Sequence, residues 1–392
     1  MTTATNPDAA PAGGDSAPVV SDRGRRVAFL DVARAIAMIG VVLMNATYVV
    51  FPAEMAGERE SSVLTSVLDA GFSLLMSGKA RAMLMVLLGV GAVLAWSSVT
   101  RRGGRPMATM LRRYVALGVL FGLPHLLVFS GDILGHYALA ALFLAPLLPL
   151  MTAGSPNRPL WFALGAFLAS PVFEPFVGSG MFQSMVIGPI PQTLGFFCVG
   201  VWLARRPELS PDFTGPNRLI APMVWGGLIG EVLGMGLLAG SDLLFPREFD
   251  ADGIPVLGPD GLPVTPLPAE MMVDLASTLT GLGGGLFYLG LVWWLLGRNG
   301  AVAKALGTLA PLGRMTLTVY LGSTAVFLLM KPFEGEVPML AQYALATGYF
   351  VVMALAARWW LSRLRLGPLE WVWRSVTHLR PQELRREERL PA

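Results

Sequence analysis

The chain has 392 residues, of which 54% are hydrophobic and 14% are charged, and its formal net charge is +3. A soluble domain carries roughly 25% charged residues, so this composition excludes an ordinary water-soluble protein and predicts a membrane protein. The positive charge comes from arginines near the ends of apolar segments, and it gives no argument for nucleic acid as a partner.

Residues 1–24 are predicted to form a disordered cytoplasmic tail. They are rich in Ala, Pro, Gly, Thr and Ser, a composition with too little apolar surface to fold. They also lack the basic start and the apolar centre of a signal peptide.

Residues 25–376 are predicted to form a single transmembrane helical domain. A helix needs about 20 apolar residues to cross the hydrocarbon layer, and about ten segments of the chain approach that length. They cover residues 27–50, 79–99, 111–130, 132–151, 159–177, 188–205, 219–245, 272–297, 315–332 and 339–361. The expected fold class is therefore an all-α polytopic membrane protein.

A shorter apolar segment over residues 62–77 contains Asp69. If it crossed the membrane, the arginines between residues 101 and 113 would move to the outer side, against the usual distribution of positive charge. We therefore interpret the segment as a short re-entrant or interfacial helix.

The basic residues predict which side each loop faces. With both termini in the cytoplasm, 23 Lys and Arg residues lie at the inner ends of the segments and five on the outer side. Cytoplasmic loops carry such an excess, so both termini are predicted to be cytoplasmic in a multi-pass protein of the cell membrane. Residues 246–271 then form an extracytoplasmic loop, and residues 377–392 form a charged cytoplasmic tail. The acidic loop lacks the later ligands of a calcium site, so no metal is expected.

The first apolar segment carries two opposite charges, Asp31 and Arg34. They are three residues apart on one helical face and can pair. An intramembrane ion pair is a functional candidate because it is costly; the alternative is that Arg34 only neutralises Asp31. Asn45, further along, can bond a neighbouring helix or face a cavity.

A second group of polar residues comprises His125, Asp132 and His136. Asp132 and His136 are four residues apart at the outer start of a predicted helix, so their side chains are expected to meet. An imidazole oriented by a carboxylate is a usual general base. Asp132 is equally suited to cap the helix, a structural role. His125 follows Pro124 in mid-helix, where a structural hydrogen bond is the alternative to chemistry.

Glu231 is a third intramembrane candidate, near the centre of the segment at 219–245 and surrounded by glycines that permit close helix packing. It is either a protonated group that joins helices or part of a cavity lining.

Five motifs in order resemble the YeiB-like family of bacterial membrane proteins. They are RVAFLDVARAIAMIGVVLMN (residues 26–45), SGKARAMLMVLLGVG (77–91), SGDILGHYALAALFLAPL (130–147), GRMTLTVYLGS (313–323) and GPLEWVWR (367–374). The last two lie in the C-terminal part, from about residue 215, which resembles domain of unknown function 418. The first motif is also similar to that of the wider transmembrane acyltransferase superfamily. The resemblance implies a bacterial plasma membrane and a site that includes Asp31, Arg34, Asn45, Lys79, Arg81, Asp132, Arg314 and Tyr320.

The resemblance implies that the protein is an acyltransferase. It would move an acyl group, expected to be acetyl, from cytoplasmic acyl-CoA to an extracytoplasmic sugar, lipid or small molecule. The base would be His136 with Asp132, or His125. Donor phosphates would bind arginines by charge-assisted hydrogen bonds, although topology and anionic lipid also explain the same residues. These arginines are Arg112, Arg113, Arg205 and Arg206.

Two other classes of function stay open. A transporter or permease for a lipid or small molecule would use Asp31, Arg34 and Glu231 as intramembrane charges. A scaffold without turnover would use none of them chemically. The sequence leaves the acceptor undetermined and a homo-oligomer open.

Overall fold

The computed structural model describes residues 22–50, 63–129, 131–177, 182–210, 213–246, 256–257, 264–298, 300–333 and 337–385. Most of the tail predicted at residues 1–24 and most of the loop predicted at residues 246–271 lie outside these ranges, as does the end of the tail predicted at residues 377–392.

The regular structure of the described residues is helical, without a strand. The first half of the chain contains α1 (Asp22–Val50), α2 (Val63–Met76), α3 (Lys79–Arg101), α4 (Pro106–Leu117), the π-helical turn η2 (Gly118–Gly122), α5 (Leu123–Leu126), α6 (Leu134–Thr152), α7 (Arg158–Phe173), η3 (Glu174–Phe176), η4 (Gln183–Ile187) and α8 (Ile190–Ala204). The second half contains η5 (Pro207–Leu209), α9 (Ile220–Leu244), α10 (Leu267–Gly297), α11 (Ala301–Gly307), α12 (Ala310–Gly313), α13 (Thr316–Leu328), η6 (Lys331–Phe333), α14 (Met339–Arg363) and α15 (Pro368–His378).

Six helical stretches among the described residues are long and apolar enough to cross a membrane, which indicates a membrane protein. They are Ala28–Ala46, Ser66–Arg101, Leu134–Thr152, Ile220–Leu244, Leu267–Gly297 and Met339–Arg363. The other apolar helices are shorter and cover Arg158–Phe173, Ile190–Ala204, Ala301–Gly313 and Thr316–Leu328. Each of the ten segments predicted from the sequence contains a helix, and the short segment predicted at residues 62–77 corresponds to α2.

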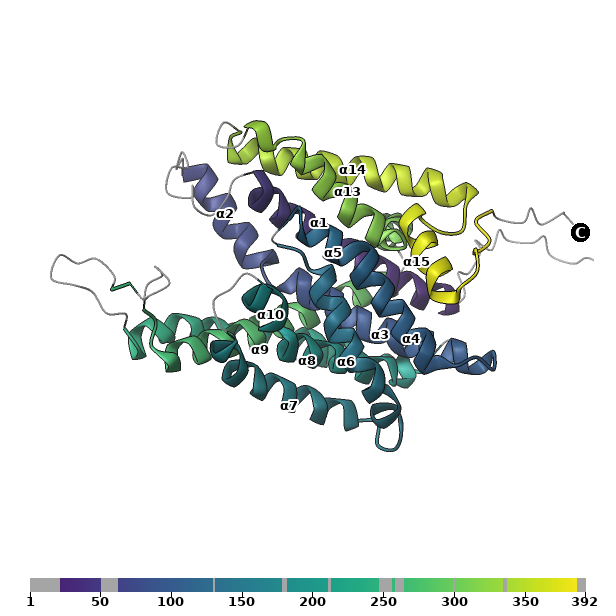
Figure 1. The fold of residues 1–392 in the computed structure, drawn as a ribbon, viewed down its shortest axis with the longest axis horizontal. Helices are drawn as coiled ribbons and strands as arrows, with labels where there is room; N and C mark the ends of the chain where they lie inside the picture. Colours follow the sequence, from purple (N-terminus) through teal and green to yellow (C-terminus); the bar gives the residue numbers. More distant parts are fainter. Residues whose placement is uncertain are drawn as a thin grey trace, which may run out of the picture.

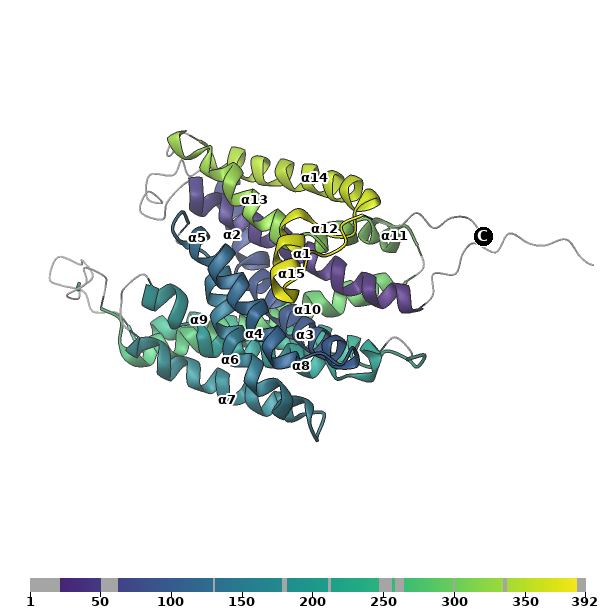
Figure 2. The same cartoon turned by 45° about the vertical axis from the view of Figure 1, so that its right-hand side comes forward.

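The helix α1 lies between two groups of helices (Figures 1 and 2). Val32 and Ala33 of α1 belong to an apolar core shared with α3, α6, α8 and α10. Ala35 and Val42 belong to a second core shared with α13 and α14. A helix with apolar residues on all sides is normally buried at the centre of a bundle, and the sequence of α1 therefore explains its central place.

Helices α9 and α10 approach each other closely through glycines. A Cβ atom built on Gly283 would clash with the Glu231 amide nitrogen, and one built on Gly227 would lie 2.6 Å from the Gly283 carbonyl oxygen. Small residues of this kind let backbones touch in apolar surroundings. Glu231 of α9 lies at this close approach between the two helices.

The segment predicted as one helix over residues 111–130 is irregular. α4 passes into η2, and the helix ends with α5 at Leu126. A Cβ atom on Gly122 would lie 2.6 Å from the Gly135 amide nitrogen, so η2 packs backbone to backbone on the start of α6. π-Helical turns occur frequently at functional sites, and this one brings His125 beside the start of α6.

The C-terminal part also differs from the prediction. α10 begins at Leu267 rather than at residue 272, with Pro266 as its N-cap and Pro268 in its first turn, where a helix tolerates proline. α15 extends to His378, and the Arg365 amide donates to the Leu384 carbonyl at 2.8 Å. The first residues of the predicted charged tail therefore fold back against the end of α14.

Candidate functional site

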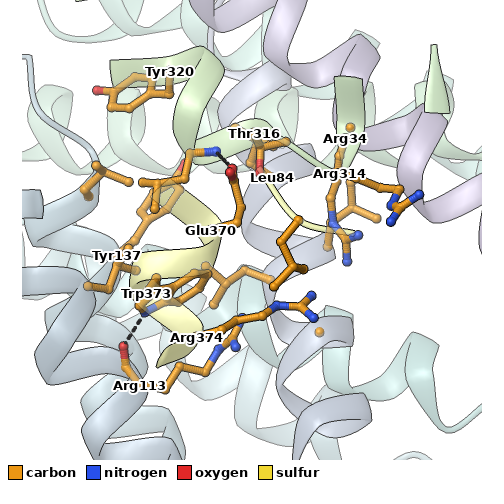
Figure 3. Close-up of a pocket in the computed structure, with 18 of the residues that line it drawn as sticks. Arg34, Leu84, Arg113, Tyr137, Arg314, Thr316, Tyr320, Glu370, Trp373 and Arg374 are labelled. Carbon is orange, nitrogen blue, oxygen red and sulfur yellow. Dashed lines mark hydrogen bonds between the residues drawn. The ribbon is translucent and has the colours of Figure 1, made fainter. Parts of the chain in front are cut away.

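A cavity of about 980 Å³ lies at the end of the molecule that contains the start of α13 and the helix α15. Its wall comes from α1, α3, α4, α6, α13 and α15 and from the chain around residues 380–383. In Figure 3 the side chains of Arg34, Arg314 and Arg374 lie along one part of the wall, and Tyr320 lies away from them.

The lining is most basic where the cavity meets the surface. Its charged residues are six arginines and three carboxylates, namely Arg34, Arg113, Arg314, Arg365, Arg374 and Arg380 with Asp31, Glu370 and Glu383. Arg314, Arg374 and Arg380 are exposed. We call all six lining arginines, the exposed and the half-buried ones together, the arginine mouth. A mouth with excess positive charge favours an anionic ligand.

Two residues of the arginine mouth have fixed positions. Arg34 Nη1 lies 3.0 Å from Asp31 Oδ1, so the ion pair predicted from the three-residue spacing is confirmed. The guanidinium group of Arg113 stacks 3.9 Å from the centre of the Trp373 ring. The Trp373 indole donates to the Arg113 carbonyl at 2.7 Å (Figure 3). α15 is thereby attached to α4 beside the cavity.

Glu370 of α15 holds the start of α13. Its Oε1 accepts hydrogen bonds from the Leu317 amide at 2.8 Å and the Thr318 amide at 3.0 Å, and its Oε2 accepts the Thr318 hydroxyl at 2.6 Å. The first amides of a helix have no partner within the helix, so the carboxylate completes α13 from outside. Burial raises the pKa of the Glu370 carboxyl, while the bonds from Thr318 and Leu317 oppose that rise.

The deep part of the cavity is mainly apolar. Leu84 and Leu87 of α3 and Leu117 of α4 line it, together with Tyr137 and Tyr320. The Tyr320 hydroxyl accepts a hydrogen bond from the Ile133 amide at 3.4 Å. Both Tyr320 and Ile133 line the cavity, and each adjoins the polar group described next.

His125, Asp132 and Thr324 form a buried chain of hydrogen bonds beyond the deep end. His125 Nδ1 lies 2.7 Å from Asp132 Oδ1, and His125 Nε2 lies 2.9 Å from Thr324 Oγ1. The side chain of Asp132 is fully buried and that of His125 is 4% exposed. The His125 ring centre lies 5.0 Å from that of Tyr320. Of the residues that line the cavity, Tyr320 faces the His125 ring, and Ile133 and Leu134 follow Asp132 directly in the sequence.

The pairing of Asp132 with His136 predicted from the sequence is wrong. α6 begins at Leu134, so Asp132 precedes the helix, and the rule that residues four apart meet on a helix does not apply to it. Asp132 instead accepts hydrogen bonds from the Leu134 amide at 3.0 Å and the Gly135 amide at 2.7 Å. The predicted cap is therefore confirmed, and the same carboxylate also binds His125.

His136 has different partners. Its Nδ1 lies 3.4 Å from the Val186 carbonyl oxygen, and its Nε2 lies 2.6 Å from Thr193 Oγ1 on α8. The side chain is buried and does not line the cavity. Its surroundings are those of a histidine that joins helices.

Lys79 and Glu231 form a second buried ion pair. Lys79 Nζ lies 3.0 Å from Glu231 Oε1, and the two side chains are 8% and 15% exposed. A Cβ atom on Gly284 would lie 2.5 Å from Lys79 Cγ, so this glycine leaves the space the pair occupies. Of the two alternatives for Glu231, the joining of helices fits, with Lys79 rather than a proton as the partner.

Three further predicted residues lie outside the cavity lining. Arg81 Nη2 donates to Gln192 Oε1 at 3.0 Å, and the Gln192 amide contacts Thr278 at 2.9 Å. Asn45 is buried within hydrogen-bonding reach of Tyr320. Arg112 contacts Thr109 at 3.4 Å and does not line the cavity.

Arg205 and Arg206 do not reach the cavity, so the structure gives no support to their predicted contact with donor phosphates. Arg205 Nη1 donates to the carbonyls of Met151 and Ser155 at 2.9 and 2.6 Å. Arg206 binds the Asn157 side chain at 2.6 Å. Both arginines stabilise the turn between α6 and α7.

Five residues described here were not predicted from the sequence as members of the site, namely Thr324, Glu370, Arg365, Arg374 and Arg380. Glu370 and Arg374 belong to the motif at residues 367–374, so the motif could have indicated their importance, which their residue types alone did not indicate. Arg365 and Arg380 entered the sequence-based prediction only in the count of basic residues that indicates the topology. Thr324 follows the motif at residues 313–323 directly and has no sequence signal of its own.

A family model described as "Protein of unknown function (DUF418)" matches residues 257–380. The match confirms the resemblance of the C-terminal part but begins later than residue 215. The chain is also similar to "Uncharacterized protein YxaH" of Bacillus subtilis (strain 168), at 25% identity over 93% of this chain and 97% of that protein. A further relative, "Uncharacterized 39.9 kDa protein in amylase 3'region" of Bacillus acidopullulyticus, is 24% identical over 93% of this chain and 96% of that protein. No solved structure matches the chain.

Proposed function

We propose that this protein is an integral membrane acyltransferase. It moves an acyl group, such as acetyl, from cytoplasmic acyl-CoA to a sugar, lipid or small-molecule acceptor on the outer side of the membrane. The observation that carries the proposal is the cavity, which runs from the arginine mouth to Tyr320 and Ile133, beside the His125, Asp132 and Thr324 chain.

The two ends of the cavity suit the two ends of an acyl-CoA molecule. Phosphates bind arginine by short, charge-assisted hydrogen bonds, and Arg314 and Arg374 are exposed at the mouth for this purpose. The thin thioester arm would follow the apolar wall formed by Leu84, Leu87 and Leu117. The acyl carbon would then come to rest against Tyr320.

His125 is the general base of the proposed reaction, with Asp132 as the group that orients it. An ionised carboxylate only accepts hydrogen bonds, so Asp132 keeps the proton of a neutral imidazole on Nδ1 and leaves Nε2 basic. The base removes the proton of the attacking acceptor hydroxyl, and the hydroxyl oxygen bonds to the carbonyl carbon of the thioester to form the new ester. The bond from that carbon to sulfur breaks, and the CoA sulfur takes the proton and leaves as a thiol. The fixed Asp132 charge stabilises the imidazolium formed on the way.

The proposed topology has ten crossings, made by α1, α3, α4 with α5, α6, α7, α8, α9, α10, α13 and α14. Both termini are cytoplasmic, and α2 is a re-entrant or interfacial helix. The arginine mouth then faces the cytoplasm in the plasma membrane of a bacterium, where the donor is made.

A labelling experiment tests this topology. A cysteine placed at Ala251 is expected to react with an impermeant maleimide in whole cells, whereas one placed at Ala9 reacts only after the cells are broken open. Native Cys198 is buried and serves as the background control in the parent protein. Labelling of Ala9→Cys but not Ala251→Cys in intact cells would reverse the orientation.

Donor binding tests the function. Purified protein is expected to bind acetyl-CoA and to release CoA from it, and Arg314→Gln or Arg374→Gln should each weaken binding at least about tenfold. A hydrogen bond to a charged group contributes about 1.5–3 kcal/mol, and about 1.4 kcal/mol is a factor of ten in affinity. Calorimetry measures the binding. Arg298→Gln is the matched control, since Arg298 is exposed outside the cavity and stacks on Trp294. If the parent protein neither binds nor cleaves acetyl-CoA, the acyltransferase proposal fails.

The buried Lys79 and Glu231 pair supports a transporter as the second candidate. Charges held inside a membrane domain commonly belong to ion or substrate pathways. Uptake or export of a solute that stops in Glu231→Gln, in a protein without thioester chemistry, would favour this function.

A further inference from the structure

Thr324 binds differently from many helical threonines of the described chain. In several of them the hydroxyl donates to the carbonyl four residues earlier in its own helix, as in Thr100, Thr109, Thr152, Thr280, Thr347 and Thr377. The Thr324 hydroxyl instead faces His125 Nε2 at 2.9 Å, across 199 positions of sequence. This bond is a tertiary contact between α13 and α5.

The direction of the bond follows from Asp132. In neutral His125, Nδ1 carries the proton that Asp132 accepts, so Nε2 can only accept. The Thr324 hydroxyl is therefore the donor, and its proton already points at the base. A hydroxyl, an imidazole and a carboxylate in this order form the usual arrangement of an activated nucleophile.

Thr324 also lies close to the deep end of the cavity. It is four residues after Tyr320 on α13, so the two side chains lie on one face of the helix. The Tyr320 ring lines the cavity and also faces the His125 ring. Thr324 itself is buried and does not line the cavity, so the Tyr320 side chain must move before the Thr324 hydroxyl can meet a ligand bound there.

We propose that Thr324 receives the acyl group first and carries it as a covalent ester before the acceptor takes it. This inference rests on the proposed acyltransferase function. The Thr324 oxygen attacks the thioester carbonyl carbon, and His125 Nε2 takes the hydroxyl proton. The bond from carbon to sulfur breaks, and the sulfur takes the proton from His125 and leaves as the CoA thiol. In the second step an acceptor hydroxyl oxygen attacks the ester carbon, and His125 takes the hydroxyl proton. The bond from that carbon to the Thr324 oxygen breaks, and the proton passes from His125 to the Thr324 oxygen.

The geometry favours this order over direct transfer. The only basic nitrogen of His125 is occupied by the Thr324 hydroxyl, so an acceptor could reach it only after Thr324 had moved. Holding the acyl group on Thr324 also allows donor and acceptor to use the site one after the other. Such a two-step route divides one difficult reaction into two easier ones.

The test uses the full chain in detergent with radiolabelled acetyl-CoA as donor and water as acceptor. After acid quenching, the parent protein is expected to carry label on the peptide that contains Thr324, in a bond that resists neutral hydroxylamine as an oxygen ester does. Thr324→Val should lose the label and slow CoA release by about 10²-fold or more, whereas Thr324→Ser should keep both. Donor binding and thermal unfolding are measured in each variant to establish that it is folded.

Thr193→Val is the matched control, because Thr193 is also buried and also contacts a histidine Nε2, that of His136, at 2.6 Å. It should keep the label. If Thr324→Val releases CoA at the parental rate, or the parent turns over without label on Thr324, the covalent step is wrong and the acyltransferase function stands. If the folded parent neither binds nor cleaves acetyl-CoA, the proposed function fails, and this inference fails with it.

Discussion

Asp132→Asn is expected to lower acyl transfer by about 10²- to 10⁴-fold, the usual contribution of a positioned general base, while donor binding persists. Asparagine is as good a helix cap as aspartate, so the start of α6 should survive the change. It lacks the charge that stabilises an imidazolium at His125, 2.7 Å away. CoA release from acetyl-CoA measures the rate, and calorimetry measures the binding.

His125→Ala should reduce turnover to the same extent, and His136→Ala is the comparison. Both histidines are buried, but His136 binds Val186 and Thr193 away from the cavity. His136→Ala should therefore lower the thermal stability of the protein but leave the rate of turnover nearly unchanged. Full turnover in both Asp132→Asn and His125→Ala would reject the base assignment. A loss confined to His136→Ala would restore the histidine first predicted beside Asp132.

Glu231→Gln is expected to lower the free energy of unfolding by about 3–5 kcal/mol, because it leaves the buried charge of Lys79 without a partner. Thermal unfolding in detergent measures the change. Removing both charges, in Lys79→Met with Glu231→Gln, should recover part of the loss, and the double-mutant cycle then gives the coupling between the two residues.

Glu383→Gln is the control for this experiment. Its partner Arg365 lies 2.7 Å away, but the two side chains are 42% and 75% exposed, and exposed ion pairs contribute only about 0–1 kcal/mol. Equal, small effects of Glu231→Gln and Glu383→Gln would show that the Lys79 and Glu231 pair is not an important structural contact. Loss of transport without loss of stability would support the second candidate function.

Interactions within one helix were predictable from the sequence because they depend on local spacing. The Asp31 and Arg34 pair follows from a separation of three residues, and the ten apolar segments follow from length and composition. The cap by Asp132 was predicted from the residue type before an apolar run. Its histidine partner was not, because the prediction placed Asp132 inside the helix, while the chain reverses between α5 and α6 and turns the carboxylate toward His125.

Contacts between distant helices could not be predicted because one sequence carries no pairing information. Lys79 and Glu231 meet only because Gly284 leaves room between α3 and α9. Glu370 caps α13 from a different helix, and Thr324 reaches His125 across the bundle. The cavity is a product of all these contacts, so in the sequence the arginines that line it resemble other arginines near the ends of apolar segments.

In the proposed reaction, the helix α13 sets a minimum reach for any acyl donor. Its start is held at the arginine mouth by Glu370 through Thr318, and Thr324 lies eight residues after its first residue, Thr316. At a rise of 1.5 Å per residue this interval is about 12 Å. A donor anchored by its phosphates must therefore extend its acyl carbon on a slender tether of at least that order. Compact donors such as acyl phosphates cannot touch both ends, so the tether, more than the acyl group, decides which donors react.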